Sequence, residues 1–155
     1  MKKKVILIIV FLLILLIATS LTYILFFMDK NNQKQTQLCF ENNCFDVELA
    51  LTSKEKKQGL MFRNYLGENK GMLFVLAMEE EYGFWMKNTL IPLDIIWLNE
   101  DKEVVFISEN NQPCKNNECP TINPDRKAKY VLELNGGTTD KIGLEVGDRT
   151  NFNIE

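Results

Sequence analysis

The chain has 155 residues, of which 46% are hydrophobic and 25% charged, with 18 Lys and Arg against 21 Asp and Glu. Its length indicates one domain of ordinary size rather than a multidomain enzyme, and its lack of histidine excludes Ser-His-Asp and Cys-His nucleophile systems and His-ligated metal sites. Residues 29–155 carry 15 cationic against 21 anionic side chains, so nucleic acid, whose phosphates require cationic patches, is not an expected partner.

An uncharged apolar segment of 24 residues, from Val5 to Met28, follows three lysines at the N-terminus. As a helix rising 1.5 Å per residue it would be about 36 Å long, enough to cross a hydrocarbon core of roughly 30 Å with some tilt. Residues 1–28 are therefore predicted to form an anchor that lies in the membrane through residues 5–28. A cleavable signal peptide is the competing interpretation, because residues 18–20 are small, but the apolar segment is longer than a typical signal core.

The lysines also predict the orientation of this anchor. Three precede the span and only Lys30 and Lys34 follow it closely, which favours a cytoplasmic N-terminus and an extracytoplasmic C-terminal domain at the cell membrane. Residues 29–37 are polar throughout and are predicted to form a solvated linker. Residues 38–155 then form the extracytoplasmic domain.

All four cysteines lie in this domain and form two pairs of equal spacing, Cys39 with Cys44 and Cys114 with Cys119. Outside the membrane such local pairs favour disulfides, although four cysteines allow three connectivities. The alternative is a metal site of four thiolates, but an oxidising compartment opposes free thiolates. A redox-active pair is disfavoured further, because C-x4-C lacks the C-x-x-C arrangement that lowers a thiol pKa. Neither a metal nor a cofactor is therefore expected.

Short apolar segments separated by Gly, Pro and Asn dominate the domain and predict strands. One short helix is predicted after the first strand, where Thr52 and Glu55 form a capping box and Gly59 ends the helix. A weaker helical turn is predicted from Thr139 to Gly143. The pattern is that of a mainly β protein, a compact β-sandwich or barrel-like domain with one or two short helices, preceded by the transmembrane helix. The predicted strands are 44–51, 71–76, 84–87, 93–99, 103–109, 130–135 and 150–155.

Several motifs occur in a characteristic order: GLMFR at 59–63, GMLF at 71–74, FWMKNTLIPLDI at 84–95 and YVLELNGG at 130–137. Together they resemble the DUF192 family, also called UPF0127, over residues 45–154. The sequence departs from the family pattern at Gly136, where alanine is common, and the cysteines at 114 and 119 resemble a pair common in the family. The resemblance implies a compact mainly β fold, often exported or membrane-anchored, and implies no established reaction.

Six residues are candidates for a ligand site, because polar side chains beside buried strands are costly unless they are paired or have a function. In the structural interpretation, Asp94 or Asn88 holds the turn at 89–92, and Lys87 or Arg63 pairs with a carboxylate. In the functional interpretation, the polar candidates converge on a cleft rimmed by a tryptophan and bind a small polar or anionic ligand. The candidates are Arg63, Trp85, Lys87, Asn88, Asp94 and Glu133.

Aromatic and thioether side chains suggest further alternatives. Trp85 beside polar groups would suit a sugar, whereas both tryptophans could equally anchor the core. Methionines 61, 72 and 86 could bind copper(I) as soft ligands, but their positions in apolar strands favour core filling. An enzyme could use Lys87 as a base with Asp94 as its partner, yet no nucleophile is identified.

We therefore expect a binding or accessory module for a small polar molecule, a glycan or an envelope protein. An envelope hydrolase or lyase is the alternative, and a metal-handling protein is a weaker one.

Overall fold

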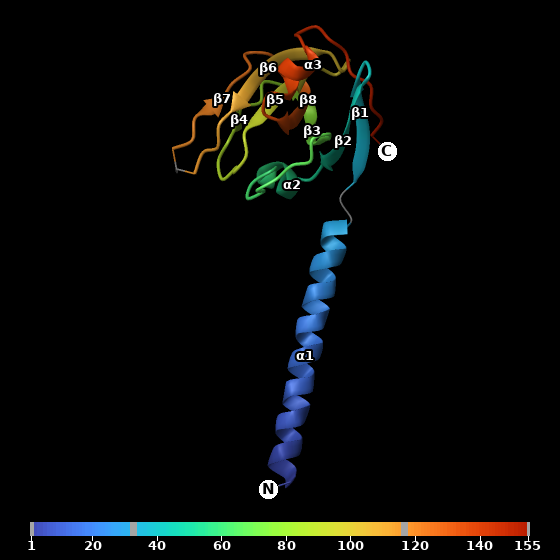
Figure 1. Ribbon diagram of the computed structural model, residues 1–155, viewed down its shortest axis with the longest axis vertical. Coiled ribbons are helices and arrows are strands. Elements are labelled where there is room, and N and C mark those ends of the chain that lie inside the picture. The colour runs from blue at the N-terminus through green and yellow to red at the C-terminus, as the bar shows by residue number, and fades with distance from the viewer. Residues whose placement is uncertain (1, 32–33, 116–117, 155) are drawn as a thin grey trace. The chain divides into compact units, whose positions relative to one another are not determined.

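The computed structural model describes residues 2–31, 34–115 and 118–154 (Figure 1). The chain divides into two compact units, residues 1–33 and residues 34–155.

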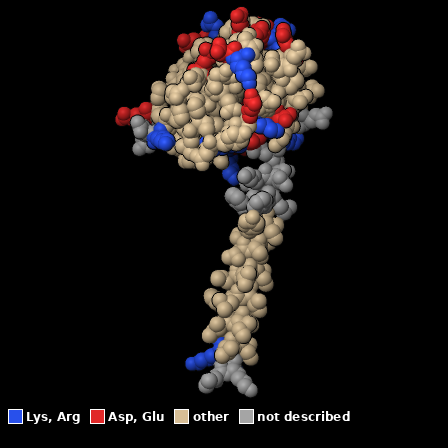
Figure 2. All heavy atoms as spheres, in the orientation of Figure 1, with Lys and Arg blue, Asp and Glu red and all other residues tan. Residues whose placement is uncertain are grey.

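The first unit is the helix α1 (Lys2–Asn31). Its segment Lys3–Ile24 is long and apolar enough to cross a membrane, and a signal sequence near an N-terminus has the same properties. The apolar side chains from Val5 to Ile24 are exposed in the structure. A helix that is apolar all round requires apolar surroundings. Over residues 3–24, the part of this helix whose side chains the structure describes, Figure 2 shows charged atoms near the N-terminal end.

The predicted linker at 29–37 is longer than the structure allows. Helix α1 continues to Asn31, and strand β1 (Gln35–Phe40) pairs antiparallel with β2 (Asn43–Ala50) from its first residue. The Thr36 hydroxyl also donates a hydrogen bond of 2.7 Å to the carbonyl of Asn153. The segment lacks an apolar pattern because β1 is an edge strand whose first residues are partly or fully exposed.

The second unit is built on a six-stranded mixed sheet, and the predicted mainly β class is confirmed. The strand order is β1-β2-β3-β8-β5-β6, in which only the β2–β3 pair is parallel. A second sheet pairs two strands of two residues each. The remaining strands are β3 (Lys70–Glu80), β4 (Phe84–Trp85), β5 (Leu93–Leu98), β6 (Val104–Asn111), β7 (Thr121–Ile122) and β8 (Ala128–Asn135).

Both faces of the large sheet are covered, because apolar side chains alternate between two separate clusters. Along β5, Ile95 and Trp97 belong to one cluster, whereas Ile96 and Leu98 belong to the other. All six residues of β5 are buried, which explains why its sequence is continuously apolar apart from Asp94. Figure 2 shows acidic and basic side chains interspersed on the visible outer surface of this unit.

Two short helices complete the domain. Helix α2 (Ser53–Gln58) has the predicted capping box between Thr52 and Glu55 and ends at Gly59. Helix α3 (Thr138–Ile142) begins one residue before the predicted helical turn and ends at Gly143. Both C-terminal glycines have positive φ angles, +48° and +66°, a conformation that disfavours side chains with a Cβ.

The cysteines form two local disulfides. Cys39 and Cys44 are also cross-strand partners in the β1–β2 hairpin. Cys114 and Cys119 close a loop between β6 and β7. Of the methionines considered as copper ligands, Met72 and Met86 are buried in the apolar cluster around Trp97, as the core-filling interpretation expects.

Candidate functional site

A buried carboxyl group lies in the middle of the large sheet. Strand register aligns Glu48 of β2, Met72 of β3, Glu133 of β8 and Ile95 of β5 in one row across neighbouring strands, so their side chains share a face. Glu133 is 5% exposed, and its Oε2 atom has no hydrogen-bond partner. Burial raises the pKa of Glu133 to about 8, although the nearby Arg63 charge opposes the increase.

Arg63 reaches this row from the loop that follows α2. Gly59 opens the loop, and a Cβ there would lie 3.2 Å from Cζ of Phe74 and 3.8 Å from Oε2 of Glu133. Arg63 then turns back onto β2 and donates two parallel hydrogen bonds to the Glu48 carboxylate, with an Nη1–Oε1 distance of 2.6 Å. This bidentate pair is only partly exposed, so solvent screens it less than an ion pair on the open surface.

The segment 84–89 lies beside the same loop. The amide of Phe62 donates to the carbonyl of Asn88 at 2.9 Å, and the amide of Asn88 donates to the carbonyl of Cys114 at the same distance. Asn88 has a φ of +56°. Trp85 is 47% exposed, and the Lys87 ammonium lies 5.7 Å from its ring centroid. The backbone thus joins this predicted polar segment to the loop that carries Arg63.

Asp94 does not join this group, because alternation along β5 places it on the opposite face from Ile95 and Glu133. Its carboxylate accepts four hydrogen bonds, from the amides of Asn110, Gly137 and Thr139 and from the Thr139 hydroxyl, at 2.7–3.0 Å. Asp94 therefore holds the start of α3 and the end of β6, rather than the turn at 89–92 that the sequence suggested.

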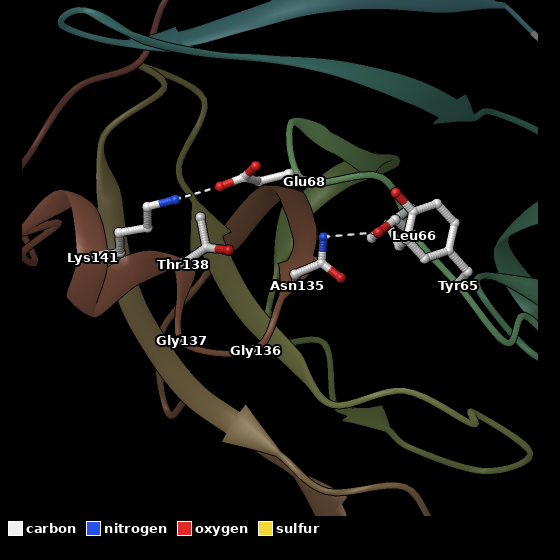
Figure 3. Close-up of a pocket in the computed structure, with 8 residues that line it drawn as sticks. All are labelled: Tyr65, Leu66, Glu68, Asn135, Gly136, Gly137, Thr138 and Lys141. Carbon is white, nitrogen blue, oxygen red and sulfur yellow. Dashed lines mark hydrogen bonds and ion pairs between the residues drawn. The ribbon is translucent and has the colours of Figure 1, made fainter.

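A pocket of about 340 Å³ opens between the loop and the end of β8. Figure 3 shows Tyr65 and Lys141 at opposite ends of it, with Asn135 between them. Asn135 lies two residues after Glu133 on β8 and so has the same face as Glu133. The lining residues are Tyr65, Leu66, Glu68, Asn135, Gly136, Gly137, Thr138 and Lys141.

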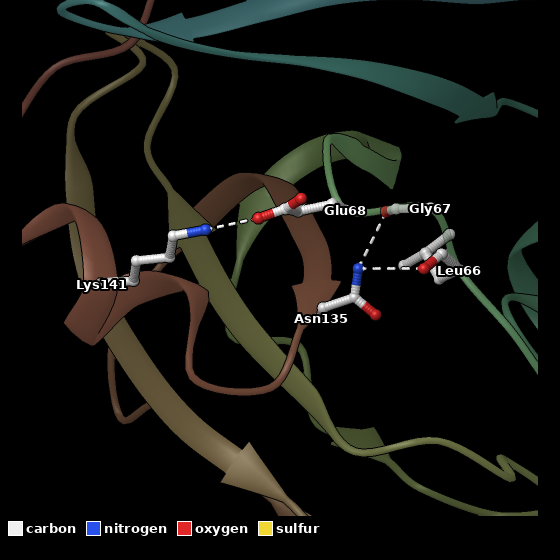
Figure 4. A network of polar contacts seen from close by, with 5 residues as sticks. All are labelled: Leu66, Gly67, Glu68, Asn135 and Lys141. Atoms are coloured by element: carbon white, nitrogen blue, oxygen red, sulfur yellow. Dashed lines mark hydrogen bonds and ion pairs between the residues drawn. The ribbon is translucent and has the colours of Figure 1, made fainter.

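Polar contacts fix the walls of this pocket (Figure 4). The Asn135 side-chain amide donates to the carbonyls of Leu66 and Gly67 at 3.3 and 2.9 Å, and thereby holds the loop against the sheet. Lys141 of α3 forms an ion pair with Glu68. The Tyr65 side chain is 79% exposed.

Sequence reasoning identified Arg63 and Glu133 as candidates but did not identify Glu48, the partner of Arg63, or the pocket. Glu48 alternates with apolar residues in β2 and therefore has the pattern of a solvent-facing side chain. Asn135 carried a usable signal, because a polar residue ends an apolar strand immediately before two glycines. Tyr65 and Lys141 carried none that sets them apart from ordinary surface residues.

A sequence profile of the DUF192 family, described as uncharacterized ACR, COG1430, matches residues 36–152. A UPF0127 protein of Pyrococcus furiosus is 33% identical over 113 residues, covering 70% of this chain and 87% of that protein. A crystal structure from Sinorhizobium meliloti, provisionally described as a transcription regulator, has a TM-score of 0.70 at 32% identity, covering 77% of this chain and 93% of that one. A Novosphingobium aromaticivorans protein of unknown function has a TM-score of 0.69 at 35% identity, covering 77% and 84%.

Proposed function

The chain belongs to the DUF192 family, and we propose that its β domain is a binding module that holds a small polar ligand of carbohydrate chemistry in the pocket between residues 65–68 and 135–138. One observation carries the proposal: an exposed tyrosine ring borders a pocket whose lining combines apolar surface with the polar side chains of Glu68, Asn135, Thr138 and Lys141. The volume of about 340 Å³ lies at the lower end of the range for small-molecule sites.

The mixed lining suits a sugar, which has both apolar ring faces and polar hydroxyl groups. A sugar ring has apolar faces that can stack on an aromatic ring such as Tyr65, while its hydroxyl groups both donate and accept hydrogen bonds. The opposite wall offers the Thr138 hydroxyl and the Glu68–Lys141 ion pair. Gly136 and Gly137 line the pocket without side chains, and their amides already donate hydrogen bonds to Pro92 and Asp94.

We further propose that α1 anchors this domain in the cell membrane with the domain on the extracytoplasmic side. The apolar length of Lys3–Ile24 supports the anchor, and the lysines that precede it support the orientation. The two disulfides support an oxidising compartment. Protease protection of the domain in spheroplasts, lost when the cell membrane itself is permeabilised, would contradict this orientation.

The binding proposal is tested with the full-length chain in lipid nanodiscs, titrated with neutral and amino sugars and followed by calorimetry. We expect Tyr65→Ala to weaken binding at least tenfold and Tyr65→Phe to retain most of it, because the ring does the stacking. Phe62→Ala is the matched control, since Phe62 is an exposed aromatic residue of the same loop outside the pocket lining. Equal loss in Tyr65→Ala and Phe62→Ala, or no sugar binding by the wild type, would overturn the proposal.

The enzymatic alternative loses its first basis, because Asp94 lies on the other face of the sheet with its oxygens occupied and does not partner Lys87. A different observation favours it: Glu133 is a carboxylic acid that keeps its proton near neutral pH, as a general acid requires. If the protein cleaves a bound sugar, loss of that cleavage with retained sugar binding in Glu133→Gln would identify Glu133 as the general acid.

A further inference from the structure

Arg63 interacts with two carboxyl groups on the same face of the sheet, with one through hydrogen bonds and with the other through its charge. Glu48 and Glu133 occupy one row across β2, β3 and β8, with Met72 between them. Neighbouring strands lie about 4.8 Å apart, so the two backbone positions are separated by about 10 Å. Arg63 holds Glu48 through two hydrogen bonds, and its charge also acts on Glu133. A long side chain that reaches one of these carboxyl groups has the other close by.

We infer that the Arg63 side chain exchanges between Glu48 and Glu133 as Glu133 loses its proton, and that the loop of residues 59–69 has one state for each partner. In the first state, Glu133 is neutral and has an oxygen without a hydrogen-bond partner, and Arg63 is hydrogen-bonded to Glu48. In the second state the proton has passed to water or hydroxide, Arg63 keeps its own charge and pairs with the Glu133 carboxylate, and Glu48 is hydrated.

The surroundings of Glu133 leave few ways to stabilise its ionised form. Its cross-strand neighbours are Met72 of β3 and Ile95 of β5, and Gly59 lies close to its Oε2. None of these groups titrates. Among the described residues, Arg63 is the charged group that acts on the Glu133 pKa, and Glu48 is the partner of that arginine. An ionised carboxylate in such a site needs a partner, and Arg63 is the group positioned to supply it.

The exchange would also reach the pocket, and this step rests on the proposed function. Tyr65 follows Arg63 by two residues in the same loop, and Asn135 follows Glu133 by two residues in β8 while holding Leu66 and Gly67. Movement of Arg63 toward β8 would therefore shift the loop that carries Tyr65 and, through Asn135, the strand that holds this loop. We expect sugar affinity to change with pH, and the midpoint of that change to coincide with the midpoint of the Arg63 exchange, close to pH 8.

The exchange is tested without a ligand, on the full-length chain in nanodiscs with ¹³C-labelled glutamate and ¹⁵N-labelled arginine, between pH 6 and pH 10. We expect the Glu133 carboxyl and the Arg63 side-chain nitrogens to shift in one common step. Glu133→Gln should abolish the Arg63 step. Glu48→Gln should move the Glu133 step to lower pH, because it frees Arg63 to pair with Glu133, and Asp46→Asn, which removes the separate ion pair with Lys70, should leave both steps in place.

Arg63 signals that stay constant while Glu133 titrates would overturn the exchange, and so would an unchanged Glu133 step in Glu48→Gln. These NMR outcomes are separate from the sugar-binding outcomes that test the proposed function. Absence of sugar binding leaves the exchange standing, whereas pH-independent sugar binding alongside the common step removes only the link between the exchange and the pocket.

Discussion

Replacing Glu133 by glutamine should remove a pH dependence of stability that the burial of this carboxyl group imposes. The folded protein raises the pKa of Glu133 from an ordinary value of 4.5 to about 8. Between these two pH values the folded state holds a proton that the unfolded state has released, so the free energy of unfolding falls as the pH rises. The stabilising contribution is complete below pH 4.5 and is lost once the pH passes about 8.

The size of the effect follows from the two pKa values. One pKa unit corresponds to about 1.4 kcal/mol. The unfolding free energy of the wild type should therefore fall by about 3 kcal/mol between pH 4.5 and pH 7. The total loss, reached once the pH is well above 8, should be about 5 kcal/mol. Glutamine has the same size and cannot ionise. The stability of Glu133→Gln relative to the wild type should therefore rise by these amounts with pH, whatever their difference at pH 5.

The assay is urea unfolding at five pH values from 5 to 9, followed by tryptophan fluorescence, since Trp97 is fully buried. Asp46→Asn is the control, because Lys70 lowers the pKa of the exposed Asp46 carboxyl, so this group stays ionised in both states from pH 5 to pH 9 and the difference from the wild type should be constant over that range. A constant difference between Glu133→Gln and the wild type from pH 5 to pH 9 would refute the reasoning, because it would mean that Glu133 ionises normally in the folded protein.

Three further changes test the structural roles assigned to other residues. Asp94→Asn should cost about 2–4 kcal/mol in urea unfolding, because an amide nitrogen replaces an acceptor of buried hydrogen bonds; an unchanged midpoint would contradict that role. Gly71→Ala should cost about 2 kcal/mol or more, because its Cβ would lie 2.6 Å from the carbonyl oxygen of residue 133, whereas Gly67→Ala meets only a flexible lysine side chain and should cost less. Replacing Cys39 and Cys44 together by serine should cost about 2 kcal/mol on the chain-entropy model, and a thermal melt unchanged by the double substitution would show that this ring adds nothing to folding.

The sequence predicted the parts of the fold that short-range chemistry determines. The capping box at Thr52 and Glu55 contains its own hydrogen-bond partners, and the cysteine pairs close rings of only six residues. It did not predict β1 from Gln35 or β7 at Thr121–Ile122. An edge strand with polar residues and a strand of two residues have no periodicity to detect, and only their partners make them strands.

The candidate site was harder to predict because strand register assembles it. Glu48 and Glu133 are 85 positions apart in the sequence, and only the pairing of β3 with both β2 and β8 aligns them. The functional interpretation of the sequence grouped Lys87 and Asn88 with Arg63 but named no contact between the two segments. The backbone bond from Phe62 to Asn88 depends on a positive φ angle that the sequence does not reveal.

Two buried carboxyl groups on one sheet show why burial alone does not identify a functional residue. Asp94 and Glu133 both interrupt apolar strands, and from sequence alone both could be explained by structure or by function. In the folded domain Asp94 accepts four hydrogen bonds, so its contribution to the turn before α3 accounts for its presence. Glu133 has an oxygen without a partner, beneath an arginine that is paired elsewhere. Its cost is not offset within the described structure, and an ordered water, a ligand or a second state of the protein is what satisfies a buried polar group of that kind.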